Sequence, residues 1–206
     1  MTELKGLHIP DSNKQFAFDI TRSFILSNVI PYWGNTDVRE VFYKAESRIE
    51  VYSFPPIGDG RFHRFLTCGI SNHVNSSGIC FNFELFFIAQ KDFGEKWCSE
   101  IFSYLASLAT DFVTQDRPAE VGLTLSTLKI VPKEWKLKFV VLDDLRGEPE
   151  ELDEIQLPNY PVKLFWVMPI FESEQHLISK EGMEAFDTAF NNQDWLIFDM
   201  QRPSII

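Results

Sequence analysis

The residues best suited to chemistry gather in the segment FHRFLTCGISNH, residues 62–73. A nucleophilic cysteine needs a histidine within hydrogen-bond reach, so Cys68 must be weighed with His63 and with His73. Side chains an odd number of positions apart in a strand point to opposite faces, which separates His63 from Cys68. His73 follows Gly69, where the chain can turn back. Cys68 with His73 is therefore the candidate pair of a small hydrolase, although no oxyanion-hole signature accompanies it.

A metal site in the same region would use His63, His73, Cys80 and Cys68. The third cysteine is Cys98, and the chain contains no Cys-x-x-Cys pair. No histidine lies at a zinc-finger spacing from two cysteines. We therefore expect no metal and no other cofactor, and we interpret the cysteines as buried, reduced thiols of a cytoplasmic protein.

A second candidate centre is FESEQH, residues 171–176. In an extended segment Glu172 and Glu174 would project to the same side, as an acid–base pair or metal ligands require, and His176 continues the alternation. This is the other version of the hydrolase hypothesis. The simpler interpretation is that these charged residues only mark the point where an apolar strand leaves the core.

Length and composition allow one large domain or two small ones, with an acidic surface. The 206 residues are 45% apolar and include twenty phenylalanines, which is ample material for a core. The net charge of −11 and the pI of about 4.8 argue against a nucleic-acid partner, because the surface repels phosphates. The same charge serves solubility and would steer a basic protein toward the chain. We find neither a membrane span nor a secretory signal, so we expect a cytoplasmic location.

Apolar periodicity predicts a helix at 16–33, a second at 92–113 with a capping box formed by Asp92 and Glu95, and a last one that starts near Ser179. Alternation predicts strands at 38–45, 49–54, 62–70, 79–88, 122–131, 137–142 and 161–170.

The strands come in runs and do not alternate with the helices. That order predicts an α+β fold, with a mixed, mostly antiparallel sheet covered by helices. We expect residues 1–15 to be an N-terminal arm and residues 16–206 to be a single domain.

The segment DDLRGEPEELDE, residues 143–154, is strongly acidic. It is by default a solvated loop, and the alternative is a docking patch for a basic partner. The candidate partner-binding residues are Asp143, Asp144, Glu150, Glu151, Asp153 and Glu154.

Three short motifs occur in a telling order: VYSFPP at 51–56, TCGIS at 67–71 and MPIFESE at 168–174. In this order and spacing, the chain resembles the suppressor-of-fused-like domain family over residues 17–192. The positions that carry the resemblance are Phe54, Pro55, Pro56, Thr67, Gly69, Ser71, Pro169 and Glu174.

The resemblance implies a non-enzymatic protein-binding module. Animal relatives bind a transcription factor with the help of a second domain, and bacterial members look like immunity proteins that neutralise a toxin. The expected partner is therefore a protein, most concretely a basic toxin, with no nucleic acid and no membrane. The hydrolase remains the alternative, and a third hypothesis is a scaffold that pairs through its sheet edges.

The resemblance also implies that the segment from Thr67 to Ser71 is the end of a strand followed by a turn of defined conformation. Gly69 would permit a backbone geometry closed to other residues, or the close approach of another strand. Thr67 and Ser71 would hydrogen-bond local backbone groups.

Overall fold

The computed structural model describes residues 12–44, 47–58, 60–90, 95–131, 135–193 and 199–206. The strands are β1 (Val38–Lys44), β2 (Ser47–Phe54), β3 (Phe62–Cys68), β4 (Phe83–Gln90), β5 (Thr124–Ser126), β6 (Phe139–Asp143), β7 (Glu154–Gln156) and β8 (Pro161–Ile170). The helices are α1 (Ser12–Trp33), α2 (Glu95–Thr114), α3 (Glu172–Glu181) and α4 (Met183–Asn191), with short 3-10 turns η1 (Ile70–Asn72) and η2 (Glu150–Leu152).

The described strands form one eight-stranded sheet in the order β1-β2-β3-β4-β8-β6-β5, and β7 pairs with β8 beside this path. Within this sheet β4 and β8 run parallel, and the other neighbouring strands pair antiparallel. The predicted α+β class and mostly antiparallel sheet are therefore confirmed.

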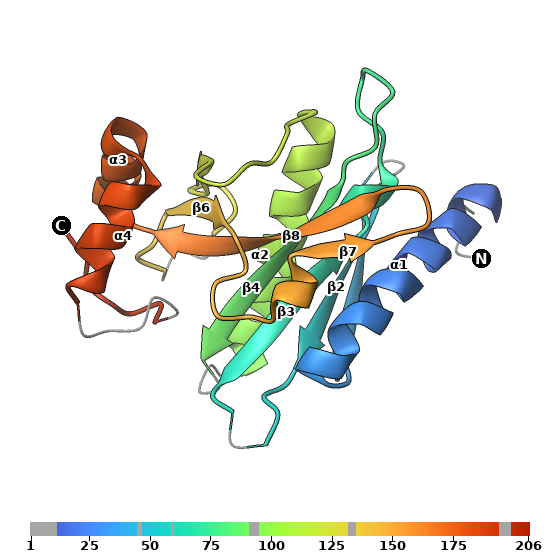
Figure 1. Cartoon of the computed structure of the whole chain (residues 1–206), viewed down its shortest axis with the longest axis horizontal. Helices are drawn as coiled ribbons and strands as arrows, with labels where there is room; N and C mark the ends of the chain where they lie inside the picture. Colours follow the sequence, from blue (N-terminus) through green and yellow to red (C-terminus); the bar gives the residue numbers. More distant parts are fainter. Residues whose placement is uncertain (1–11, 45–46, 59, 91–94, 132–134, 194–198) are drawn as a thin grey trace, which may run out of the picture.

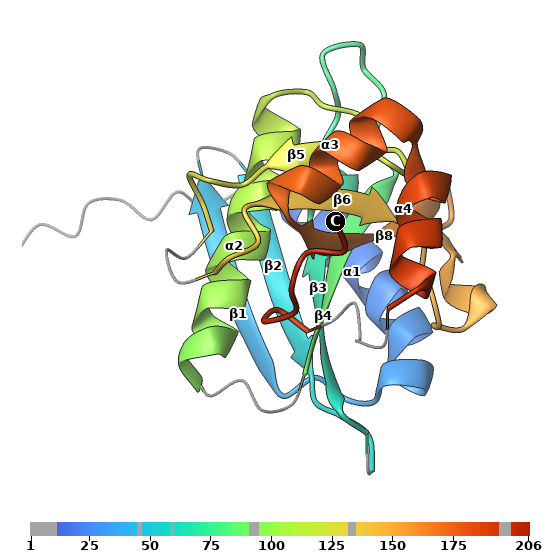
Figure 2. The same ribbon diagram turned by 90° about the vertical axis from the view of Figure 1, so that its left-hand side faces the viewer.

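Helices cover both faces of the sheet (Figure 1). The α2 side holds one apolar core, and the opposite side holds a second core to which α1, α3 and α4 contribute. Figure 2 shows the sheet between α2 and α1, with α3 and α4 across the end where β5 and β6 lie. No described helix is long and apolar enough to cross a membrane.

The alternation predicted for β4 is confirmed. Phe81, Phe83, Leu85 and Phe87 all join the core beneath α2. The strand nevertheless begins at Phe83 and not at residue 79. The earlier residues close a turn, because the Asn75 side chain accepts the N–H groups of Ser77 and Ile79 at 3.0 and 2.8 Å.

The first helix begins at Ser12, four residues before the predicted start, so residues 12–15 are helical. The apolar residues Phe18, Ile25, Val29 and Trp33, which produce the helical periodicity, are all buried. The helix ends as expected before Gly34, whose N–H bonds the Ile30 carbonyl at 2.9 Å. The apolar residues of α2 also face the core. Asp92 of its predicted capping box lies outside the described residues.

The C-terminal part differs most from the prediction. Two helices, α3 and α4, stand where a single helix from Ser179 was expected, and Gly182, with φ of 87°, separates them. The strand expected at 122–131 is the short β5, because the N–H groups of Ile130 and Val131 both bond the Thr127 carbonyl in a turn. The acidic segment is not a plain loop, since it holds η2 and joins β6 to β7.

Candidate functional site

The turn after β3 closes around the carboxylate of Glu84, which is fully buried on β4. Its Oε1 atom accepts the N–H groups of Gly69 and Ser71 at 2.9 and 3.0 Å, and the Ser71 hydroxyl at 2.7 Å. Its Oε2 atom accepts the Thr67 hydroxyl at 2.7 Å and the Ile70 N–H at 3.3 Å. The turn is therefore a set of donors arranged around one buried acid.

Gly69 is the position that makes this turn possible. Its φ of 138° is one that residues with a side chain rarely adopt. A Cβ atom there would lie 2.4 Å from the carbonyl oxygen of Arg48 on β2. The predicted special geometry and close backbone approach are both confirmed.

Burial raises the pKa of the Glu84 carboxyl, while the hydrogen bonds from Ser71, Gly69 and Thr67 act in the opposite direction. Glu84 was not among the predicted site residues, and the hydroxyls of Thr67 and Ser71 were expected to bond local backbone groups. The signal was present, because a lone acid inside the apolar strand FNFELFFI must find donors. Tyr160 donates to the Ser71 carbonyl at 2.7 Å and fixes the turn from outside. These contacts give the family motif a structural role.

The predicted pair of Cys68 and His73 lacks the electrostatics of a nucleophilic pair. Cys68 is fully buried, and burial raises the pKa of its thiol well above the usual value, with the charges of Glu84 and Glu50 adding to the rise. Burial and the nearby charge of Lys14 lower the pKa of His73. Both shifts disfavour a thiolate–imidazolium pair. No side-chain hydrogen bond joins Cys68 to His73 in the described structure.

A second buried acid, Glu50 on β2, anchors α1 to the sheet. It forms a close ion pair with Arg48, accepts the Tyr52 hydroxyl, and lies 3.5 Å from the guanidinium of Arg22 on α1. Burial and the hydrogen bond to Glu50 raise the pKa of Tyr52. Arg48 also lies over the ring of Phe18, with 4.4 Å between the guanidinium carbon and the ring centroid. This polar cluster holds α1 in a defined position.

The FPP motif closes the other end of the same core. Phe54 is fully buried and meets the ring of Trp33 edge-on, with centroids 5.3 Å apart. Pro55 and Pro56 follow the last residue of β2, where proline ends ladder pairing. The motif therefore joins the end of β2 to the end of α1.

The predicted site at Glu172 and Glu174 is not formed, because the segment is the start of α3 and not an extended strand exit. Glu172 is exposed, whereas Glu174 is fully buried. The Glu174 carboxylate bonds both terminal nitrogens of Arg202, at 2.5 and 2.7 Å, and accepts the N–H groups of Phe171 and Ile205. His176 is exposed, and the described residues contain no cluster suited to a metal ion.

This contact also explains the third motif. Arg202 donates to the carbonyl of Pro169 at 3.3 Å in addition to its ion pair with Glu174. The motif residues therefore fasten the segment around Arg202 against the end of β8. Nothing in the sequence near Arg202 indicates this role.

Asp143, one of the predicted partner-binding residues, is buried, so the exposure on which it was chosen is absent. Its carboxylate pairs with the Nε atom of Arg146 at 2.5 Å, and Arg146 bonds Asp187 of α4 through both Nη atoms, at 2.5 and 3.1 Å. Burial raises the pKa of Asp143, against the opposing charge of Arg146. Asp143 is therefore an internal anchor of the segment.

Glu148 is a second anchor of the same segment. Its Oε1 atom accepts from Arg64 of β3 at 2.7 Å, and its Oε2 atom accepts from the indole of Trp33 at 2.7 Å. The Glu148 side chain is only 4% exposed. The segment is thus fixed to α1, to the sheet and to α4.

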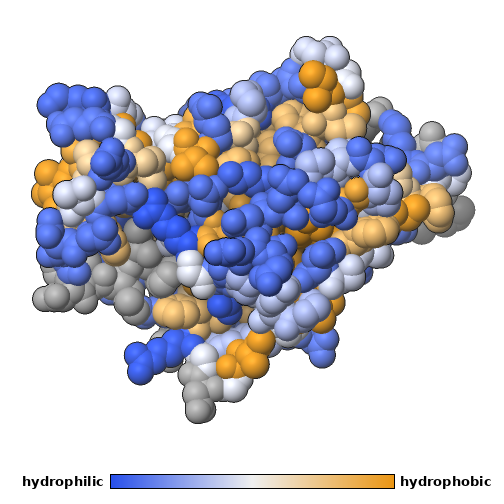
Figure 3. Space-filling view, in the orientation of Figure 1, coloured by the Kyte–Doolittle hydropathy of each residue, from blue (hydrophilic) through white to orange (hydrophobic). Residues whose placement is uncertain are grey.

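Beside these anchors the segment presents an acidic patch, defined by Asp144, which follows the first anchor, and by Glu150, Glu151, Asp153 and Glu154, which follow the second. All five residues are exposed. Figure 3 shows hydrophilic surface over η2 and β7, where most of the patch lies. A shallow hollow of about 380 Å³ borders it, lined by Asp144, Leu145, Arg146, Asp153, Glu154 and Lys163. In this hollow Lys163 pairs with Asp144 at 2.6 Å.

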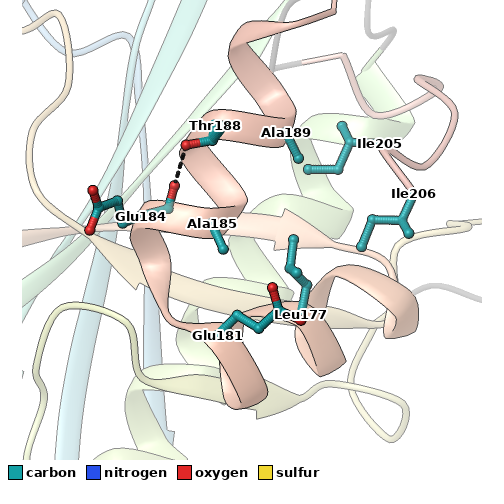
Figure 4. Close-up of a pocket in the computed structure, with 8 residues that line it drawn as sticks. All are labelled: Leu177, Glu181, Glu184, Ala185, Thr188, Ala189, Ile205 and Ile206. Carbon is teal, nitrogen blue, oxygen red and sulfur yellow. Dashed lines mark hydrogen bonds between the residues drawn. The ribbon is translucent and has the colours of Figure 1, made fainter.

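An open groove of about 610 Å³ lies between α3, α4 and the C-terminal segment. Leu177, Ala185, Ala189, Ile205 and Ile206 provide its apolar lining (Figure 4). The remaining lining residues are Glu181, Glu184 and Thr188, whose hydroxyl bonds the Glu184 carbonyl at 2.9 Å. The groove holds no reactive pair.

The chain is thus an α+β protein with one mixed sheet. Within the described residues, the buried acids Glu50, Glu84, Asp143 and Glu174 are held by structural donors, and five exposed acids of the segment after β6 form a patch. The sequence profile of the suppressor of fused protein family (SUFU) matches residues 45–203. The chain therefore belongs to the suppressor of fused family, and the resemblance is confirmed.

Solved structures share this fold. A suppressor of fused homologue from Neisseria gonorrhoeae FA 1090 is 18% identical, with a TM-score of 0.69 over 91% of this chain and 97% of that one. A chain of the Sufu–Fu complex is 16% identical, with a TM-score of 0.66 over 96% and 93%. Drosophila Suppressor of Fused is 17% identical, with a TM-score of 0.59, and the match covers 92% of this chain and 50% of that chain. No curated protein matches the sequence significantly.

Proposed function

We propose that the chain is a protein-binding module that captures a basic protein through its acidic patch, and that it acts as a bacterial immunity protein against a toxin. The observation that carries the proposal is the placement of five exposed acids on a segment with two buried anchors. One family member of the same fold is known in complex with a protein, the Sufu–Fu complex.

The anchors matter because they hold the patch in place before binding. The ion pairs of Asp143 with Arg146 and of Glu148 with Arg64 leave the backbone of the segment little freedom. A pre-ordered surface loses less conformational entropy when it binds, so more of the interaction energy appears as affinity. The acids nearby can then accept lysine and arginine side chains without refolding.

The charge of the chain supports a basic partner. A net charge of −11 attracts a cationic protein over a distance and raises the rate of encounter. A toxin that acts on nucleic acid needs a basic surface, and an acidic patch would cover such a surface. Salt should weaken the complex, because it screens this attraction.

The test is an affinity pull-down with the purified chain as bait, with mass spectrometry to identify the bound protein. We expect one basic protein that leaves the bait as salt rises. Glu150→Lys, Glu151→Lys and Glu154→Lys together should abolish its capture, because they reverse the charge of the patch.

The matched control combines Asp37→Lys, Glu120→Lys and Glu181→Lys, which are exposed acids outside the patch and change the net charge by the same amount. The control should keep the partner. Equal loss of binding in both variants would show that only overall charge matters, and equal retention would remove the patch from the mechanism. Inhibition of the captured protein's toxicity then tests the immunity role.

A further inference from the structure

The hollow beside the acidic patch already holds a cation of the chain itself. Lys163 lies on β8, outside the acidic segment, and its Nζ atom is 2.6 Å from the Oδ1 atom of Asp144. The same ammonium lies 5.0 Å from the centroid of the Phe165 ring, whose face attracts positive charge. The side chains of the ion pair stay open to water, at 39% exposed for Lys163 and 57% for Asp144. The hollow therefore contains a formed position for a positively charged side chain, and Lys163 fills it.

The charges that line the hollow leave an excess of acid. The charged residues of its lining are Asp144, Asp153, Glu154, Arg146 and Lys163. Arg146 does not compensate these acids, because Asp143 and Asp187 already engage its guanidinium. Among the described lining residues, Lys163 is thus left to balance three carboxylates. The hollow therefore remains attractive to a further positive charge.

The ion pair of Lys163 with Asp144 can open at little cost. Exposed ion pairs contribute little to stability, because water screens them and two long side chains must be held in place. A lysine ammonium is a point charge on a flexible stem, whereas the guanidinium of an arginine is a rigid fork that bonds a carboxylate through two N–H groups. Such two-point bonds are stronger than single ones. An incoming arginine can therefore displace Lys163 from Asp144.

We propose that the hollow receives an arginine side chain of the basic partner, and that Lys163 is an internal placeholder which this arginine displaces. The inference rests on the proposed function and names the contact through which the patch would select its partner. Leu145, which is buried in the wall of the hollow, offers an apolar surface to the methylene stem of such an arginine. The guanidinium would then bond Asp144 and the neighbouring acids of the lining.

A placeholder of this kind lowers affinity and raises selectivity. A partner that offers a lysine to Asp144 only replaces one ammonium by another, so it gains little from the exchange. A partner that offers an arginine gains the second hydrogen bond of the guanidinium fork. Specificity is a difference between affinities, and Lys163 enlarges that difference by competing with the weaker cation.

The test is the affinity of the full chain for fluorescein-labelled hexa-arginine and hexa-lysine peptides, measured by fluorescence anisotropy at low salt. We expect hexa-arginine to bind at least about threefold more tightly, because only a guanidinium makes two-point bonds. Lys163→Met should tighten hexa-arginine binding by about two- to fivefold, as expected when one exposed ion pair no longer competes. Lys163→Arg should weaken it by about twofold or more, because an arginine at this position holds Asp144 more firmly.

The matched control is Lys180→Met, which removes the same charge and another exposed ion pair, that of Lys180 with Glu181 at 3.1 Å. It should change the affinity for hexa-arginine by less than about 1.5-fold, because solvent and salt screen charges outside the hollow. In an Asp144→Asn background, Lys163→Met should gain no more than Lys180→Met does, since no carboxylate is then left for Lys163 to occupy. Thermal melts should show every variant folded, because the changed side chains are all partly exposed.

Equal affinity for the two peptides overturns the proposal, because the hollow would then not distinguish arginine from lysine. So does a result in which Lys163→Arg binds like the parent and Lys163→Met binds like Lys180→Met, because Lys163 would then act only through its charge. These outcomes are separate from the fate of the proposed function. A pull-down without a basic partner would refute that function and leave the peptide affinities as measured, whereas unchanged peptide affinities would leave a captured partner in place.

Discussion

Ser71 meets the carboxylate of Glu84 twice, through its backbone N–H at 3.0 Å and through its hydroxyl at 2.7 Å. The two residues belong to a turn and to a central strand, and their contact decides the shape of the turn. Without this acid, the N–H groups of the turn would be buried and unpaired. The conformation of the motif around Gly69 therefore depends on Glu84.

The first prediction concerns Gly69. Gly69→Ala should lower the free energy of unfolding by about 3 kcal/mol or more, because the new Cβ meets a backbone carbonyl and the φ is strained. Gly58→Ala is the control, since Gly58 also has a positive φ but open space around it. It should cost about 1 kcal/mol. Urea denaturation measures both, and equal losses would refute the close-approach argument.

The second prediction concerns the charge of Glu84. Glu84→Gln keeps the shape but turns amide hydrogens toward the N–H groups of the turn, so it should lose about 2–4 kcal/mol of unfolding free energy. Glu120→Gln on the surface should stay within about 0.5 kcal/mol of the parent. If Glu84→Gln loses no more unfolding free energy than Glu120→Gln, the donors of the turn do not need a negatively charged acceptor.

The third prediction concerns pH. Because burial raises the pKa of Glu84 above 4.5, the folded protein keeps this proton at a pH where the unfolded chain has lost it. The free energy of unfolding should therefore fall as pH rises from about 4.5 to the raised pKa. The pKa of Asp143 is also raised, so this group likewise makes the free energy of unfolding fall as pH rises. Urea denaturation across this range should give a smaller slope for Glu84→Gln than for the parent, and an unchanged slope would contradict the assignment.

The fourth prediction concerns thiol reactivity. Cys80 is exposed, whereas Cys68 is buried with a raised thiol pKa. In a Cys98→Ser background, a disulfide reagent such as DTNB should label Cys80 quickly and Cys68 only when the chain unfolds. Cys80→Ser should remove the fast phase. Rapid labelling of Cys68 in the folded protein would reopen the hydrolase hypothesis.

The fifth prediction concerns Glu174 and Arg202. Arg202→Met should cost about 3–5 kcal/mol, because it leaves a buried carboxylate unpaired. Glu174→Leu combined with Arg202→Met should cost clearly less than the sum of the two single changes. Lys180→Met breaks an exposed ion pair and should change stability by less than about 0.5 kcal/mol. If the double variant loses as much unfolding free energy as the two single variants together, Glu174 and Arg202 are not directly coupled.

The sequence predicted the parts of the fold that depend on local periodicity. Phe83, Leu85 and Phe87 alternate without interruption, and the inner face of α1 repeats clearly, so both elements were predicted, although β4 begins four residues later and α1 four residues earlier than expected. The start of α3 was missed because Glu172 and Glu174 fit a strand period as well as a first helical turn. Six residues do not separate the two periods.

The partners of Glu174 and Glu148 could not be predicted, because they are distant in the chain. Glu174 pairs with Arg202, and Glu148 with Arg64 and Trp33. Asp143 looked like its acidic neighbours in the sequence. Only the fold shows that it points inward and that Asp144 does not.

The parallel pairing of β4 with β8 has a consequence for how the chain reaches its native state. β1 to β4 are a simple antiparallel run, whose contacts can form as soon as that part of the chain exists. Phe83 and its neighbours on β4 can pair with Lys163 and the rest of β8 only later. All of α2 and β6 lie between the two strands in the sequence. Pairings of such long separation form late. During synthesis, the centre of the finished sheet is therefore for a time its open, apolar edge, and this is the stage at which the chain is most exposed to aggregation.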